Sequence, residues 1–179
     1  SSAKSWSTAY DFDALRRGLL KREEWQTDLV TPIQGFAFNI PRPQFKDPRV
    51  RRAFNLAFDF EWASKNILFD QYTRVGSYFE NSELKAKGLP TGRELELLES
   101  VREQVPKEVF TTPYANPFNR GPEDARRHMA EAAKLLAAAG WKQQNAELRN
   151  AAGEAFTVEF LIVSPEFERI IQPYGVALG

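Results

Sequence analysis

The stretch that decides the fold lies at residues 45–59 and reads FKDPRVRRAFNLAFD. Asp47 followed by Pro48 is a strong start signal for a helix. A carboxylate at this place accepts a hydrogen bond from the first turn, and proline at the first helical position costs no amide bond. Apolar residues then recur at three- and four-residue spacing, at Val50, Phe54, Ala57 and Phe58. The pattern predicts an amphipathic helix with one face on a core.

Two more helices are predicted from the same kinds of signal. Asp59 is placed to cap a second helix over residues 61–69. The clearest helix begins at residues 121–124, where an acidic first turn favours the positive end of the helix dipole, and it ends at Gly140. Trp141 is expected to pack back on the last turn of that helix. The buried side is expected to hold Ala125, Met129, Ala132, Ala133 and Leu136.

Shorter helices are expected in three places, at residues 11–18, 82–87 and 93–103. Asp11 is the expected cap of the first of these. A last helix is predicted to begin at Ser164, and Pro173 should kink it because proline removes an intrahelical hydrogen bond. Pro106, Pro113 and Pro117 mark an irregular crossing before residue 121.

Alternating apolar residues predict strands in two regions. Residues 34–40 alternate, with an aromatic face that includes Phe36 and Phe38. Residues 146–149 and 154–163 flank a turn at residues 150–153, which predicts a hairpin whose second strand is central in a sheet. The expected core consists of Phe36, Phe38, Phe54, Leu136, Phe156, Phe160 and Ile162. These elements together predict a single α/β or α+β lobe.

Composition excludes several classes of protein. The chain has 179 residues, and its 24 basic and 24 acidic side chains give a net charge of zero, which argues against nucleic-acid binding. The absence of Cys excludes disulfides and thiolate chemistry. The longest uncharged stretch, residues 29–41, is too short to span a membrane. The chain opens without Met, and we expect it to be a piece of a larger protein.

The sequence offers no pattern for catalysis, a metal or a cofactor. The single histidine, His128, has no ligand-like neighbours and is expected on a helix surface or boundary. No nucleophile elbow, phosphate-binding loop or dinucleotide fingerprint occurs. The acidic residues at 94–99 are most simply a solvated helix face, and Glu123 and Asp124 already serve a helix dipole. We therefore expect no catalytic residues, no metal site and no cofactor.

The aromatic and polar loop over residues 70–81 is the one candidate binding site. It has neither helical nor strand periodicity, and a loop displayed on a rigid scaffold is a common place for recognition. Rings can enclose a ligand while an arginine and small polar groups hydrogen-bond it. The alternative is a loop pinned to the domain by its own aromatic residues. The candidate ligand-binding residues are Tyr72, Arg74, Ser77, Tyr78, Phe79 and Asn81.

Three stretches, in order, carry a resemblance to a known family. Residues 45–53 followed by 57–59 resemble the F-x-D-x-R-V-R-x-A…A-x-D signature of bacterial family 5 solute-binding proteins, the peptide receptors of ABC importers. Residues 133–141 and 158–174 match the same family in the same order. The stretches nearest to the branch linked to microcin C and oligopeptide uptake lie at residues 5–12, 34–39 and 78–84.

The resemblance implies a fold for the chain. Residues 1–179 would form a single-lobe fragment of a two-lobed receptor. That fragment would be most of the second lobe of a class II periplasmic-binding-protein fold, a mixed sheet flanked by helices. The family's acidic anchor for the peptide amino terminus would lie beyond residue 179.

The resemblance also implies a function. The protein would be a monomeric, non-enzymatic receptor that binds oligopeptides or peptide-like compounds and delivers them to a membrane permease. It would be periplasmic, or extracellular and lipid-anchored. Two alternatives stay open: an extracytoplasmic sensor or interaction module on the same lobe, and a hydrolase.

Overall fold

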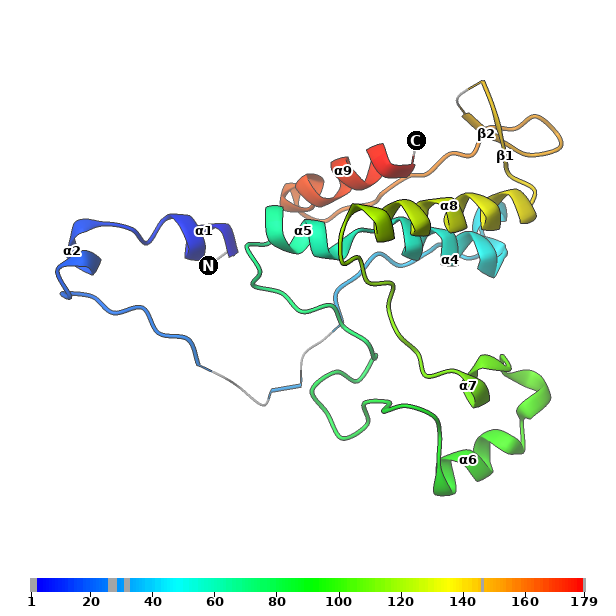
Figure 1. Ribbon diagram of the computed structural model, residues 1–179, viewed down its shortest axis with the longest axis horizontal. Coiled ribbons are helices and arrows are strands. Elements are labelled where there is room, and N and C mark those ends of the chain that lie inside the picture. Colours follow the sequence, from blue (N-terminus) through cyan, green and yellow to red (C-terminus); the bar gives the residue numbers. More distant parts are fainter. Residues whose placement is uncertain (1–2, 26–28, 31–32, 146, 179) are drawn as a thin grey trace.

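Three helices form the centre of the molecule. The computed structural model describes residues 3–25, 29–30, 33–145 and 147–178. Helices α4 (Pro48–Ala57) and α8 (Pro122–Ala138) pack along each other, and α9 (Glu168–Leu178) packs on α4. Figure 1 shows α8 and α4 side by side, with α9 (red) packed near them.

Helix α4 begins where the sequence predicts. The Asp47 side chain accepts a hydrogen bond from the backbone N–H of Arg49 at 2.8 Å, so the predicted cap is confirmed. The Arg49 guanidinium holds the pKa of Asp47 below its usual range by hydrogen bonding the ionised carboxylate. The helix buries one apolar face, made of Val50, Ala53, Phe54, Leu56 and Ala57.

The core is built around the Phe54 ring. Phe38, Phe45, Phe156 and Tyr174 surround it, with ring centroids 5.5 to 6.2 Å from that of Phe54. Of the core predicted from the sequence, Phe54 and Leu136 are buried, and the partly buried Phe38, Phe156 and Phe160 pack against them. The prediction is wrong for Phe36, which is 42% exposed although it contacts Phe160, and Ile162 is only half-buried.

A hydroxyl from α9 completes the end of α4. The last four carbonyls of a helix lack intrahelical partners, and Phe54 carries one of these in α4. The Tyr174 hydroxyl donates to the Phe54 carbonyl at 2.7 Å from a position 120 residues later in the chain. Burial raises the pKa of Tyr174, so this hydroxyl stays protonated and remains a donor.

The predicted strands are confirmed only in part. Strands β1 (Lys142–Gln144) and β2 (Glu147–Arg149) form a two-stranded antiparallel sheet. The predicted hairpin is present next to its turn at residues 150–153, where Arg149 bridges Ala155 and the Phe156 N–H donates to the Leu148 carbonyl, but its long second strand is absent. Residue 146, where the first strand of the predicted hairpin begins, lies outside the described residues. Within the described part of the chain no mixed sheet flanked by helices is present.

Residues 34–40 and 157–163 are extended without forming a strand, whereas the Phe156 N–H still donates to the Leu148 carbonyl at 2.8 Å. Alternation correctly indicates that Phe38, Phe156 and Phe160 face the core, yet a strand also needs a backbone partner. The Phe36 ring of the first segment contacts the Phe160 ring of the second, and the side chain of Gln44, just after the first segment, donates to the Thr157 carbonyl. Leu161, on the other side of the second segment, is 96% exposed.

Helix α5 (Phe60–Asn66) and the end of α8 follow the sequence closely. Asp59 accepts from the backbone N–H of Trp62 at 3.0 Å, which confirms the cap although the helix ends earlier than predicted. Gly140 ends α8 with φ of 93°, and Trp141 packs back on the core as predicted. The prediction for Ala133 is wrong, because that residue is exposed.

The short helices agree less well with the sequence. Residues 82–87 form a turn and not a helix, because Ser82 closes back on the Phe79 carbonyl. Asp11 is not a cap: its carboxylate pairs with Arg16 while Phe12 precedes the helix. The other short elements are α1 (Ala3–Thr8), α2 (Asp13–Arg16), α3 (Pro43–Lys46), η1 (Arg102–Gln104) and η2 (Pro165–Phe167).

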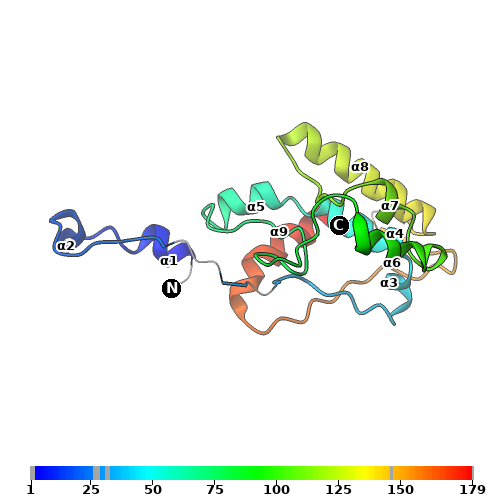
Figure 2. The ribbon, with the colours of Figure 1, turned by 90° about the horizontal axis from the view of Figure 1, so that it is seen from below.

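Two parts of the chain extend from the helical body, a name we give to α4, α5, α8 and α9. One is the N-terminal arm with α1 and α2, and the other is the excursion, residues 70–118, which carries α6 (Gly92–Glu99) and α7 (Glu108–Thr111) (Figures 1 and 2). Neither α6 nor α7 buries a residue. Among the described residues, no helix is both long and apolar enough to cross a membrane.

Candidate ligand-binding site

The loop over residues 70–81 is free of helix and strand, as the sequence predicts. Its three rings face outward to different extents: Tyr78 is 80% exposed, and about half of the surface of Tyr72 and Phe79 is exposed. Exposed rings on a loop supply contact area to a ligand at a small cost in side-chain entropy. The structure thus leaves these rings accessible.

Arg74 is bound to the protein itself. Its guanidinium donates to the Pro117 carbonyl at 2.7 Å and to the Asn55 side-chain oxygen at 2.8 Å. It also lies 5.8 Å from the centres of the Phe58 and Phe60 rings. Burial lowers the pKa of Arg74 from its ordinary value. These contacts hold the loop against the body through Arg74, whereas the alternative drawn from the sequence was a loop pinned by its own aromatic residues.

The polar residues of the loop shape its backbone. The Ser77 hydroxyl accepts from the Phe79 N–H at 3.2 Å, and Glu80 accepts from the Gly76 N–H at 3.1 Å. Glu80 also pairs with Lys85, and this hydrogen bond lowers the pKa of the Glu80 carboxyl. Asn81 has a left-handed backbone with φ of 58°, which Asn tolerates better than most residues.

A second loop, residues 113–118, lies against the first. The Asn116 amide donates to the Val75 carbonyl at 2.8 Å, next to the bond from Arg74 to Pro117. The two bonds join residues 74–75 to residues 116–117, and we call this junction the neck. Sequence reasoning missed the second loop, because the prolines there predicted only an irregular crossing. The sequence YANPF at residues 114–118 combines aromatic and amide side chains, and this combination could have indicated a second loop of the same kind.

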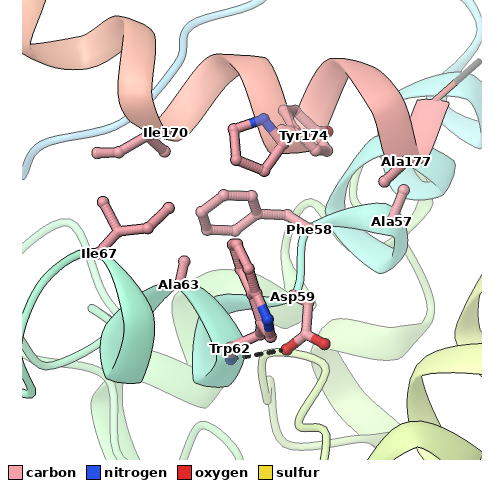
Figure 3. A pocket seen from close by; sticks show the side chains of 10 residues that line it. Ala57, Phe58, Asp59, Trp62, Ala63, Ile67, Ile170, Tyr174 and Ala177 are labelled. Atoms are coloured by element: carbon pink, nitrogen blue, oxygen red, sulfur yellow. Dashed lines mark hydrogen bonds between the residues drawn. The ribbon is translucent and has the colours of Figure 1, made fainter.

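A groove lies between α5 and α9 (Figure 3). Its volume is about 210 Å³, and its lining is mostly apolar, including Phe58, Trp62 and Ile170. Asp59 is occupied in capping α5, as the dashed line in Figure 3 shows. Phe58 both lines this groove and lies under Arg74, so the groove and the neck share one ring.

His128 belongs to a hydrogen-bonded chain at the start of α8. One ring nitrogen, Nδ1, lies 2.7 Å from the Asn119 side-chain oxygen, and the Asn119 N–H donates to Glu61 at 2.9 Å. His128 lies within α8 and is partly buried, which agrees with the expected position between helix surface and core. In the described part of the chain, no three His, Asp or Glu side chains are grouped as a metal site requires.

Sequence comparison defines the class of protein. The model for the middle part of the bacterial extracellular solute-binding proteins of family 5 matches residues 2–174. The chain therefore belongs to this family, as its motifs indicate.

Three relatives show which members it is similar to. It is 43% identical over 177 residues to a probable peptide-binding protein, YejA, of Agrobacterium fabrum, covering 97% of this chain and 29% of the relative. Identity to an uncharacterized YejA of Escherichia coli is 34%, over 99% of this chain and 30% of the relative. Identity to a peptidoglycan-binding protein, YepA, of Agrobacterium fabrum is also 34%, over 100% of this chain and 30% of the relative. The chain thus spans less than a third of each of these relatives.

Proposed function

We propose that the protein is the substrate-binding component of an ABC importer and takes up oligopeptides or peptide-like compounds. The observation that carries the proposal is the family match over residues 2–174, together with 43% identity to a relative named as a probable peptide-binding protein. In this proposal residues 1–179 form one lobe, which closes on the ligand with a second lobe. Closure presents a different surface to the permease than the open form does.

The candidate loop fits a receptor that binds its ligand without chemistry. Tyr72, Tyr78 and Phe79 present accessible rings, and Arg74 fixes the loop that carries them. A receptor needs such preformed contacts because every group that must be ordered on binding reduces affinity. The proposal places the protein in the periplasm, or outside the cell on a lipid anchor, as a monomer without enzymatic turnover.

A second ligand class is favoured by one relative. The 34% identity to a peptidoglycan-binding protein makes peptides released from peptidoglycan a candidate among the peptide-like compounds. Such peptides share the backbone amides and short side chains of oligopeptides, so the same aromatic loop suits both.

The test is to identify the ligand that the full-length protein retains. We expect native mass spectrometry of protein purified from the periplasmic fraction to show a bound mass, and fragmentation to show amino-acid residues. Calorimetry with the released compound should then give a single site. A protein that carries a sugar or a metal in place of a peptide would refute the proposal, as would steady hydrolysis of the added peptide.

Loop variants locate the site in the full-length receptor. Tyr78→Ala and Arg74→Ala should each weaken peptide binding by about 1–3 kcal/mol, the range for well-placed aromatic and charged groups. Arg74 acts through the position of the loop, since its own donors are bound to Pro117 and Asn55. If both variants fold and bind like the wild type, the loop is structural and the site lies elsewhere.

A further inference from the structure

The groove between α5 and α9 has two apolar walls (Figure 3). Ile170, Pro173 and Ala177 line one wall, and their spacing of three and four residues places them on one face of α9. Trp62 and Ala63 of α5 line the opposite wall. The groove therefore follows α9 from its first turn to its last turn.

Solvent reaches these walls. Trp62 is 47% exposed, Ala177 is exposed at the end of α9, and Ile170 and Pro173 are only partly buried. The removal of apolar surface from water is favourable in proportion to the area that is covered. A segment that places apolar side chains in the groove thus gains free energy from both walls at once.

The hydrogen-bonding side chains in the lining are largely used within the body. The Asp59 carboxylate accepts from the backbone N–H of Trp62, and the Tyr174 hydroxyl donates to the Phe54 carbonyl. What the groove mainly offers to an occupant is therefore apolar area. Its chemistry suits a segment with apolar side chains along one face.

The position of the groove indicates which segment covers it. Ala177 lines the groove and α9 ends at Leu178, so a chain that continues from α9 starts beside the groove. This protein matches the middle part of its family and spans less than a third of its relatives. Consecutive elements usually lie side by side, and a short connection gives a high effective concentration. A segment that turns back after α9 is thus well placed to enter the groove.

We propose that the groove is the docking site for the segment that follows residue 178 in the full-length receptor. This segment turns back along α9 and covers the groove with an apolar face. The inference goes beyond the proposed function, because it concerns how the body is completed and holds for any ligand. Phe58 lines the groove and also lies under Arg74, so the docked segment supports the ring on which the neck rests.

Cross-linking in the full-length receptor identifies the occupant. The photoreactive amino acid p-benzoylphenylalanine replaces Trp62, and mass spectrometry of the irradiated and digested protein locates the product. We expect a link within one chain to residues that follow residue 178. The same amino acid in place of Leu161, which is 96% exposed and outside the groove, should give no link to that segment. A link to a second copy, to another segment only or to a copurified compound would overturn the inference, as would the absence of any link.

A matched pair of variants tests whether docking needs an open groove. Ala177→Trp places a large ring in the groove from an exposed position. Val176→Trp adds the same ring at the preceding residue, which is 83% exposed and does not line the groove. In the full-length receptor, Ala177→Trp should make limited proteolysis of the segment after residue 178 several-fold faster, and Val176→Trp should leave the rate unchanged.

Equal proteolysis rates in the two variants would overturn the inference, whether both match the wild type or both exceed it. This result is separate from the test of the proposed function. A receptor that retains a peptide through purification upholds the proposed function even if the segment after residue 178 lies elsewhere.

Discussion

The body and the excursion stabilise their residues by different means. In the body, α4 packs its apolar face against α8 and α9, and Val50 has no exposed surface. In the excursion, α6 and α7 bury no residue, and the structure depends on individual hydrogen bonds and ion pairs such as Arg93 with Glu96. Apolar burial gives the body a stability that is spread over many contacts. The excursion instead depends on the hydrogen bonds of the neck, so we expect that replacing a single residue of the neck changes the position of the excursion.

The largest effect is expected from Phe54→Ala. The side chain is buried and meets four other rings, so its removal should lower the free energy of unfolding by about 3–5 kcal/mol. Phe110→Ala in the excursion removes a ring that stacks on Arg102, and it should cost less than about 1 kcal/mol. Denaturant titration measures both. Equal losses would mean that the excursion is part of the same core.

Tyr174→Phe tests the joint between α9 and α4. The variant keeps the ring and removes the hydroxyl that donates to the Phe54 carbonyl, which leaves a buried acceptor unpaired. We expect a loss of about 1–2 kcal/mol in the free energy of unfolding, from the same titration. Tyr10→Phe, on the N-terminal arm, is the control, and it should leave stability unchanged. A Tyr174 variant as stable as the wild type would show that the carbonyl finds another donor.

Arg74→Ala tests the neck. Without its bonds to Pro117 and Asn55, the excursion should open more often, and limited proteolysis within residues 76–112 should become several-fold faster. Cleavage within α4 and α8 should keep its wild-type rate. The control is Arg93→Ala, which removes an exposed guanidinium that pairs only along its own helix. Unchanged proteolysis in the Arg74 variant would mean that the excursion is held by other contacts.

The smallest effect is expected at the α4 cap and depends on pH. Hydrogen bonding to Arg49 lowers the folded-state pKa of Asp47, so the ionised cap stabilises the fold above the unfolded pKa of about 3.9. This contribution is lost as pH falls through the folded pKa. Asp47→Ala should therefore cost about 1 kcal/mol at pH 7 and progressively less below pH 4. Urea titrations of both proteins across this range measure the difference, and a constant difference would exclude the carboxylate as its source.

The sequence predicts the body well because its signals are local. Asp47 and Asp59 cap helices through the N–H groups of the residues that follow them, and Gly140 ends α8 through its own backbone conformation. Pairing of extended segments is not local. Nothing in the sequence of residues 156–163 indicates which backbone lies beside them. Their alternation therefore predicted the inward face correctly but wrongly predicted a long β-strand.

In the candidate site too, the local features are predictable from the sequence and the long-range contacts are not. The sequence indicates that residues 70–81 form a loop with rings, and the structure agrees that it is a loop with its rings exposed. The partner of Arg74, the Pro117 carbonyl, lies 43 residues away and is a backbone group that every residue possesses. No sequence pattern singles out such a carbonyl. The second loop therefore became visible only when the fold brought Asn116 to Val75.

The bond from Tyr174 to the Phe54 carbonyl also sets an order of events in folding. Its two ends are 120 residues apart, so α4 can form early but reaches its final state only after residue 174 has been made. Contacts of such separation slow folding, because a long loop must close before the contact contributes any energy. A nascent chain that stops before residue 174 would leave the Phe54 carbonyl without this donor and the Phe54 ring without its contact to Tyr174. Completion of the body therefore waits for α9, which brings the Tyr174 hydroxyl to α4.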